Sequence, residues 1–190
     1  MQDEEPVIEL DLPHGELSDE TEAYFKLCRE KLGLLPNVLR AYAFHETKLR
    51  AFTEFYNELM LAPSDLSKLD REMIAVVVSS INHCHYCVIA HGATVRALSG
   101  DAALGDTLAV NYRAAPLGER ERAMLDYAAA LTKDPGTAGE AAITALREAG
   151  FSDAAIWDIT SVAAFFNMTN RVATATKMVP NQEYYRMGRP

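Results

Sequence analysis

Apolar residues recur along most of this chain at intervals of three and four, which places them on one face of a helix. The pattern predicts helices over residues 19–32, 37–60, 67–81, 87–98, 102–111, 118–132, 137–149 and 154–178. The segment 37–60 is long enough for one helix or two. No segment shows the convincing apolar–polar alternation of a half-buried strand. The sequence therefore predicts an all-α fold.

Residues typical of helix ends stand at several of these boundaries. Ser18 precedes the first predicted helix and Gly33 follows it. Ser67 is a candidate N-cap, with Asp70 three residues later as in a capping box. The valine run 76–78 would also suit a strand. Because the apolar pattern there is continuous and follows a cap, helix is favoured.

Length and composition indicate one compact domain. The chain has 190 residues, of which 49% are hydrophobic, enough to bury a sizeable core. We expect the helical domain to span residues 18–180. A flexible N-terminal segment, 1–17, and a C-terminal tail, 181–190, would flank it.

The charge balance limits the classes of partner. The formal net charge is −9, which argues against nucleic acid or an anionic membrane as a partner. No apolar run approaches the length of a membrane span. The first residues are acidic and lack the basic and apolar regions of a signal peptide, so we expect a cytoplasmic protein.

The chemistry concentrates in Cys84-His85-Tyr86-Cys87, followed by His91. Spacings of three and four place Cys84, Cys87 and His91 on one helical face. Cys84 would lie near the helix start, where the free backbone N–H groups and the helix dipole favour a thiolate. In a reducing compartment such a pair is typical of a redox site or a metal site, not of a structural disulfide.

Two other interpretations of the cysteines were weighed. The pair and His91 could bind zinc, with His83, His85 or Glu72 as the fourth ligand. Structural zinc sites more often join two separated ligand pairs, and here there is only one pair. Cys28 lies in an apolar helical stretch and is expected to be a small core residue.

Glu72 lies twelve residues before Cys84, on the preceding predicted helix. A short turn at residues 82–83 would fold the two helices into a hairpin, but spacing alone does not establish that Glu72 reaches His91. The pattern Glu-x11-Cys-x-x-Cys-x3-His, formed by Glu72, Cys84, Cys87 and His91, resembles that of the AhpD-like alkylhydroperoxidases in the carboxymuconolactone decarboxylase superfamily. The segments 33–37 and 170–173 resemble its branch of uncharacterised peroxidase-related proteins. The resemblance covers roughly residues 20–188.

The resemblance implies an AhpD-like helical bundle that forms a homo-oligomer, a trimer or a hexamer. It also implies thiol-dependent reduction of hydroperoxides. We expect no cofactor and no metal. Cys87 would attack the peroxide, Cys84 would donate a proton and then form the disulfide, and Glu72 and His91 would relay protons. The helix-start argument alone favours Cys84 as the reactive thiol. The electron donor would be a thiol or lipoylated protein, or a peroxiredoxin partner.

One position departs from the family pattern. Characterised AhpD proteins carry a histidine just before the second cysteine, where this chain has Tyr86. Since a tyrosine with a pKa near 10 is a poor base at neutral pH, the relay would be simplified or rerouted. A non-redox lyase of the decarboxylase type is the alternative function, although it would not need Cys84 and Cys87.

Overall fold

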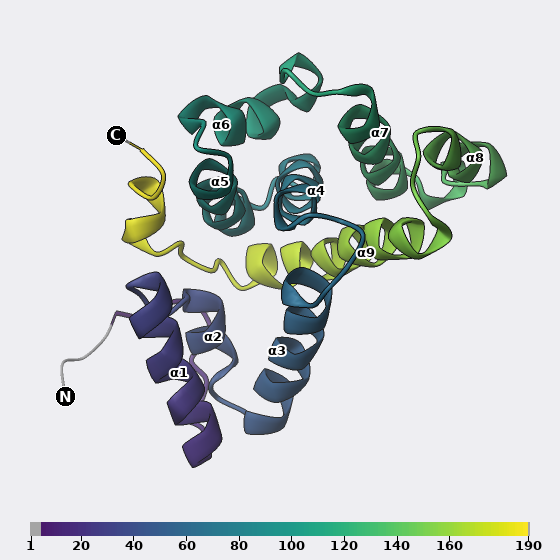
Figure 1. Cartoon of the computed structure of the whole chain (residues 1–190). Coiled ribbons are helices and arrows are strands. Elements are labelled where there is room, and N and C mark those ends of the chain that lie inside the picture. The colour runs from purple at the N-terminus through teal and green to yellow at the C-terminus, as the bar shows by residue number, and fades with distance from the viewer. Residues whose placement is uncertain (1–4, 190) are drawn as a thin grey trace.

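The protein is an assembly of helices (Figure 1). The structure, a computed structural model, describes residues 5–189. Its α-helices are α1 (Asp19–Leu32), α2 (Asn37–Tyr42), α3 (Glu46–Leu61), α4 (Lys68–Ile81), α5 (His85–Ser99), α6 (Ala102–Asn111), α7 (Glu119–Lys133), α8 (Glu140–Glu148) and α9 (Asp153–Ala175). Short 3-10 helices are η1 (Tyr112–Ala114), η2 (Pro135–Thr137) and η3 (Gln182–Tyr185). Residues 5–189 contain no strand, and the predicted all-α fold is confirmed.

The caps predicted from the sequence are present. Ser18 accepts a hydrogen bond from the backbone N–H of Thr21 at the start of α1, and Gly33 ends that helix with a left-handed φ of 74°. Ser67 and Asp70 form a capping box with both of its hydrogen bonds at the start of α4. These local signals depend only on neighbouring residues, so the sequence was sufficient to find them.

The segment 37–60, which the sequence left open as one helix or two, is two helices, since the chain turns between Tyr42 and Glu46. Two predicted boundaries differ from the structure. The helix predicted from 137 begins at Glu140, because residues 135–137 form a 3-10 turn whose Gly136 N–H donates to Asp134. The helix predicted to reach 178 ends at Ala175.

The early end of α9 has a physical cause. Lys177 takes a left-handed φ of 53°, and the N–H of Met178 donates back to the carbonyl of Ala173 at 2.9 Å. This turn buries the Met178 side chain, which a further helical turn would carry away.

Helix α4 occupies the centre of the bundle. It packs against α5, α6, α7 and α9, which surround it in Figure 1. Ile74, Val76 and Val78 are completely buried, so the valine run is helical and apolar on all sides. A helix that is hydrophobic all round is expected only where it is covered all round. Residues on α4 therefore have fixed surroundings, and Glu72 is one of them.

Helices α1, α2 and α3 lie together on one side of the bundle, next to α9 (Figure 1). They share a small core around Phe25, Leu39 and Leu49. This layer is joined to the rest partly through α3, which contacts α4 and α9.

The segments outside the helical bundle are tied to it by hydrogen bonds. Arg96 on α5 is buried and donates to the carbonyls of Tyr184 at 2.7 Å and Met187 at 3.1 Å. Near the other end of the chain, the N–H of Glu9 donates to the carbonyl of Thr176 at 2.9 Å. Residues 1–4 of the predicted flexible segment lie outside the described residues. The division at residues 18 and 180 stays a prediction.

Within the described part of the chain, no helix has the length and apolar character needed to cross a membrane.

Candidate active site

The turn between α4 and α5 positions the cysteine motif. His83 takes a left-handed φ of 54°, and the N–H of Cys84 donates to the carbonyl of Ser79 at 2.9 Å. The side chain of Asn82 donates to Asn170 Oδ1 on α9 at 3.0 Å. Cys84 is the N-cap of α5, and Cys87 lies in its first turn. The predicted placement of the motif at a helix start is confirmed.

The hairpin brings Glu72 and His91 into contact. Glu72 Oε2 lies 2.6 Å from His91 Nδ1, and both side chains are largely buried. The rings of His91 and Phe166 pack edge to face, with their centroids 4.6 Å apart. With Glu72 ionised, Nδ1–H donates to the carboxylate, so Nε2 is the nitrogen left to exchange protons. Spacing alone did not establish that Glu72 reaches His91. The helices α4 and α5 have the register that brings the two together, as the resemblance implied.

The two cysteines of the motif are buried, free thiols that interact with each other. A hydrogen bond from the Cys87 side chain lowers the pKa of Cys84 to about 6, against the effect of burial. The backbone N–H of Cys87, the Thr174 side chain and the charge of His91 lower the pKa of Cys84 further. The hydrogen bond to Cys84 and burial raise the pKa of Cys87. The pKa directions therefore favour Cys84 over Cys87 as the thiolate of the pair, chiefly because Cys87 donates to it.

Two polar residues next to Cys87 were not predicted as site residues. Asn170 donates from Nδ2 to Ser79 Oγ at 2.9 Å, and both residues are almost completely buried. Their hydrogen bonds to Cys87 act to lower its pKa, against the larger effects of Cys84 and burial. Ser79 could have been noticed as a polar residue in an apolar helix, but only the fold brings it to Cys87.

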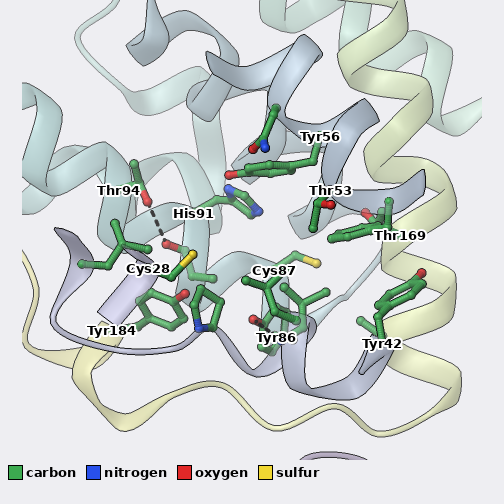
Figure 2. Close-up of a pocket in the computed structure, with 18 of the residues that line it drawn as sticks. Cys28, Tyr42, Thr53, Tyr56, Tyr86, Cys87, His91, Thr94, Thr169 and Tyr184 are labelled. Carbon is green, nitrogen blue, oxygen red and sulfur yellow. Dashed lines mark hydrogen bonds between the residues drawn. The ribbon is translucent and has the colours of Figure 1, made fainter. Parts of the chain in front are cut away.

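Cys87, His91 and Glu72 line one cavity of about 520 Å³. Figure 2 shows Cys87 and His91 in this cavity together with Tyr56, Tyr184 and Cys28. Its walls are mainly aromatic and aliphatic side chains from α1, α2, α3, α5, α9 and the C-terminal segment. These include Leu27, Leu39, Tyr42, Phe52, Tyr56, Phe165, Phe166, Val172 and Tyr184. No local pattern in the sequence marks them as wall residues, because the wall is assembled from segments far apart in the chain.

Cys84 does not line this cavity. It lines a second, smaller one of about 340 Å³, with His83, His85, Lys177 and Tyr185. The two sulfur-bearing side chains of one motif therefore belong to two different cavities, although they hydrogen-bond to each other.

Tyr86, at the position where the family has a histidine, has a structural contact. Its hydroxyl accepts a hydrogen bond from the backbone N–H of Val38 on α2 at 3.0 Å. Burial raises the pKa of Tyr86 well above its ordinary value of 10, so the hydroxyl stays protonated at neutral pH. The Tyr86 hydroxyl therefore does not replace the family histidine as a base.

The remaining candidates lie apart from the Glu72–His91 pair. Cys28 is buried as predicted, and burial raises its pKa, but its side chain also faces the larger cavity. His85 Nε2 lies 3.3 Å from the hydroxyl of Tyr185. Among the residues that the structure describes, no three His, Cys, Asp or Glu side chains are grouped so that they could hold a metal ion. The zinc alternative thus has no ligand set in this part of the chain.

Comparisons with known proteins agree with the motif. Residues 48–103 match the carboxymuconolactone decarboxylase family. An uncharacterized peroxidase-related protein from Silicibacter sp. TM1040 is 58% identical, with a TM-score of 0.94 over 100% of this chain and 99% of that one. A second such protein, described as an alkylhydroperoxidase AhpD core from Ralstonia eutropha JMP134, is 39% identical, with a TM-score of 0.93 over 98% and 99% of the two chains.

A more distant relative is a protein of unknown function from Agrobacterium tumefaciens. It is 28% identical, with a TM-score of 0.62 over 70% of this chain and 89% of that one. None of the curated proteins matches the chain. The chain belongs to the carboxymuconolactone decarboxylase family, in its AhpD-like group, and shares the fold of peroxidase-related proteins.

Proposed function

We propose that the protein is a peroxidase that reduces organic hydroperoxides through a Cys84/Cys87 dithiol–disulfide cycle. The observation that carries the proposal is the arrangement of three groups around Cys87. Its side chain lines the larger cavity together with His91, which Glu72 contacts at 2.6 Å. Its thiol hydrogen-bonds to Cys84, which is not on that cavity. A nucleophile, a proton donor and a second thiol are therefore adjacent.

The first step is proton transfer within the cysteine pair. Cys84 is the resting thiolate and already accepts the Cys87 hydrogen bond, so the Cys87 proton passes to Cys84. The Cys87 thiolate then attacks the terminal oxygen of the hydroperoxide, and the O–O bond breaks. The departing alkoxide takes a proton from His91 and leaves as an alcohol. Cys87 is now a sulfenic acid.

The second step closes the disulfide. Cys84 attacks the sulfur of the Cys87 sulfenic acid, and the hydroxyl leaves with the Cys84 proton as water. The cycle thus converts two thiols and one hydroperoxide into a disulfide, an alcohol and water. Because Cys84 is already hydrogen-bonded to Cys87, the sulfenic acid is trapped before further oxidation.

The cavity wall supports an organic substrate over hydrogen peroxide. A volume of about 520 Å³ lies within the range of small-molecule sites. Leu39, Phe52 and Phe165 offer apolar contacts that hydrogen peroxide has no group to use. We therefore propose that the substrates are hydroperoxides with a hydrocarbon or aromatic body.

The proposal includes partners and a location. A thiol or lipoylated protein, or a peroxiredoxin, would supply the electrons, and the reducing cytoplasm would be the setting. A trimer or hexamer is supported by apolar side chains left exposed in the single chain: Leu27, Leu32 and Leu61 at the larger cavity, and Phe55 on α3. Sedimentation of the purified protein tests the oligomer.

Steady-state turnover tests the function itself. With cumene hydroperoxide and dithiothreitol, we expect Cys87→Ser and Cys84→Ser to abolish consumption of the hydroperoxide, since either change breaks the dithiol cycle. Cys28→Ser is the matched control, because it removes a buried thiol on the same cavity that the cycle does not use. Wild-type turnover in Cys87→Ser would reject the proposed site. Absence of turnover in the parent protein would reject the peroxidase function and favour the non-redox lyase, which needs neither thiol of the motif.

A further inference from the structure

The two cysteines of the motif face different sides of the α5 start. Cys87 lines the larger cavity, between the α1–α3 layer and the bundle. Cys84 lines the smaller one, which is bounded by His83 and His85 next to it and by Thr174 and Lys177 at the end of α9. A disulfide between them would therefore present one sulfur to each cavity.

We propose that the two half-reactions use separate openings: the hydroperoxide reaches Cys87 through the larger cavity, and the reductant reaches Cys84 through the smaller one. The peroxide half of this statement rests on the proposed function. The reductant half does not, because it concerns only which sulfur of the disulfide an incoming thiol attacks.

The exchange at Cys84 balances as follows. The incoming thiolate forms a bond to Cys84 Sγ, the Cys84–Cys87 bond breaks, and its electron pair leaves with Cys87 as a thiolate. The second thiol of the reductant then attacks its own sulfur in the mixed disulfide and releases Cys84 as a thiolate. The reductant leaves as a disulfide, and solvent returns one proton to the pair.

The surroundings suit both leaving groups. In the resting enzyme the hydrogen bond to Cys84 raises the pKa of Cys87. This hydrogen bond is lost while Cys84 is held in the mixed disulfide. Ser79 and Asn170 still donate to Cys87. Once the returning proton has reached Cys87, Cys84 leaves last, because the Cys87 hydrogen bond lowers its pKa to about 6 in the reduced pair. A thiol of low pKa leaves fastest, so the final step is favoured.

The burial of Cys84 selects the form of the reductant. The residue is only 1% exposed, so a thiol fixed on the flat surface of a folded protein cannot reach its sulfur. A cavity of about 340 Å³ admits a narrow chain that carries a dithiol. The opening therefore fits a thiol on a narrow chain and not one fixed in the surface of a folded protein.

Trapping the mixed disulfide tests the site of attack on the unmodified protein. The Cys84–Cys87 bond is formed with diamide, so the experiment does not depend on peroxide activity. A short reaction with 2-mercaptoethanol is quenched with N-ethylmaleimide, and peptides are analysed by mass spectrometry. We expect mercaptoethanol on Cys84 and maleimide on Cys87. Mercaptoethanol on Cys87 instead would overturn the proposal.

Two matched tryptophan variants separate the openings. His85→Trp narrows the smaller cavity, and Thr53→Trp narrows the larger one. We expect His85→Trp to slow reduction by dithiothreitol at least ~5-fold and to leave oxidation by cumene hydroperoxide unchanged. We expect Thr53→Trp to slow oxidation by cumene hydroperoxide and to leave reduction by dithiothreitol unchanged. Unchanged reduction in His85→Trp, in a variant that melts like the parent, would contradict the proposal.

The same assay tests the requirement for a narrow chain. Dithiothreitol and a thioredoxin, whose dithiol is fixed in the folded protein, are compared as reductants of the diamide-oxidised protein. We expect faster reduction by dithiothreitol, and faster reduction by the thioredoxin would overturn the requirement.

Discussion

Glu72 Oε2 on α4 lies 2.6 Å from His91 Nδ1 on α5, so the carboxylate orients the imidazole whose other nitrogen is left to exchange protons at the cavity of Cys87. Both side chains are largely buried, which strengthens the interaction relative to one in water. The pair is formed across a turn of three residues, between two helices that belong to the rigid core.

We predict that Glu72→Gln slows oxidation of the thiols by cumene hydroperoxide at least ~10-fold. The amide keeps the size of the side chain but replaces the carboxylate that contacts Nδ1 and orients the His91 ring. Rapid-mixing measurements across pH 5–9 would show a changed pH profile. Glu58→Gln, an exposed residue on α3, is the control. A wild-type rate and profile in Glu72→Gln would exclude a relay through His91.

The thiolate of Cys84 is predicted to depend on Cys87. A hydrogen bond from Cys87 is the largest cause of the Cys84 pKa of about 6, so thiolate absorbance at 240 nm should show one thiol titrating near pH 6. Cys87→Ala should shift that titration upward. If the titration of Cys84 is the same in the variant, the pair is not coupled as described.

The same pKa shift has a consequence for stability. The Cys84 pKa is about 6 in the folded chain and about 9 ordinarily, so between these values the unfolded chain binds more protons. This group therefore adds stability as pH rises from 6 to 9, and the contribution is lost as pH falls through 6. Urea unfolding of wild type and Cys84→Ala at pH 5.5 and 8.5 measures it. A stability difference between the two proteins that does not grow with pH would contradict the prediction.

Tyr86→Phe is predicted to affect stability and not the pH profile. The change leaves the backbone N–H of Val38 without its partner, at a cost of about 1–3 kcal/mol in the free energy of unfolding. The pH profile of peroxide reduction should keep its wild-type midpoints, because the Tyr86 hydroxyl stays protonated. If the rate in Tyr86→Phe no longer rises with pH as it does in the wild type, Tyr86 does act as a base.

Asn170→Leu is predicted to weaken both the fold and the site. Asn170 is 1% exposed and joins Asn82, Ser79 and Cys87 across three elements. Leucine removes the buried amide that bonds to all three, and we expect a loss of about 1–3 kcal/mol in urea unfolding. Met168→Leu, at an exposed position on the same helix, is the stability control. An equal stability of Asn170→Leu and wild type would show that the network is dispensable.

The sequence was sufficient for the helices and for the local part of the site. Periodicity and caps located α1 and α4, and the spacing of four placed Cys87 and His91 at one cavity. The prediction that Cys84 shares this face was wrong, because Cys84 is the N-cap of α5 and lines the smaller cavity. The end of α9 was missed because it depends on the burial of Met178 after the turn, which helix propensity does not report.

The non-local part of the site needed the fold. Contact between Glu72 and His91 depends on the register of two helices, which only the family resemblance indicated. The cavity wall combines residues as distant as Tyr56 and Tyr184. The separation of Cys84 from Cys87 depends on how the end of α9 and the C-terminal segment pack beside α5, and no spacing within the motif encodes it.

The most direct test of the peroxidase account is the fate of the three thiols after one equivalent of cumene hydroperoxide, located by peptide mass spectrometry. The account predicts that Cys84 and Cys87 are converted to one disulfide within the molecule and that Cys28 remains a free thiol. Recovery of both Cys84 and Cys87 as unreacted thiols, with the hydroperoxide intact, would contradict it.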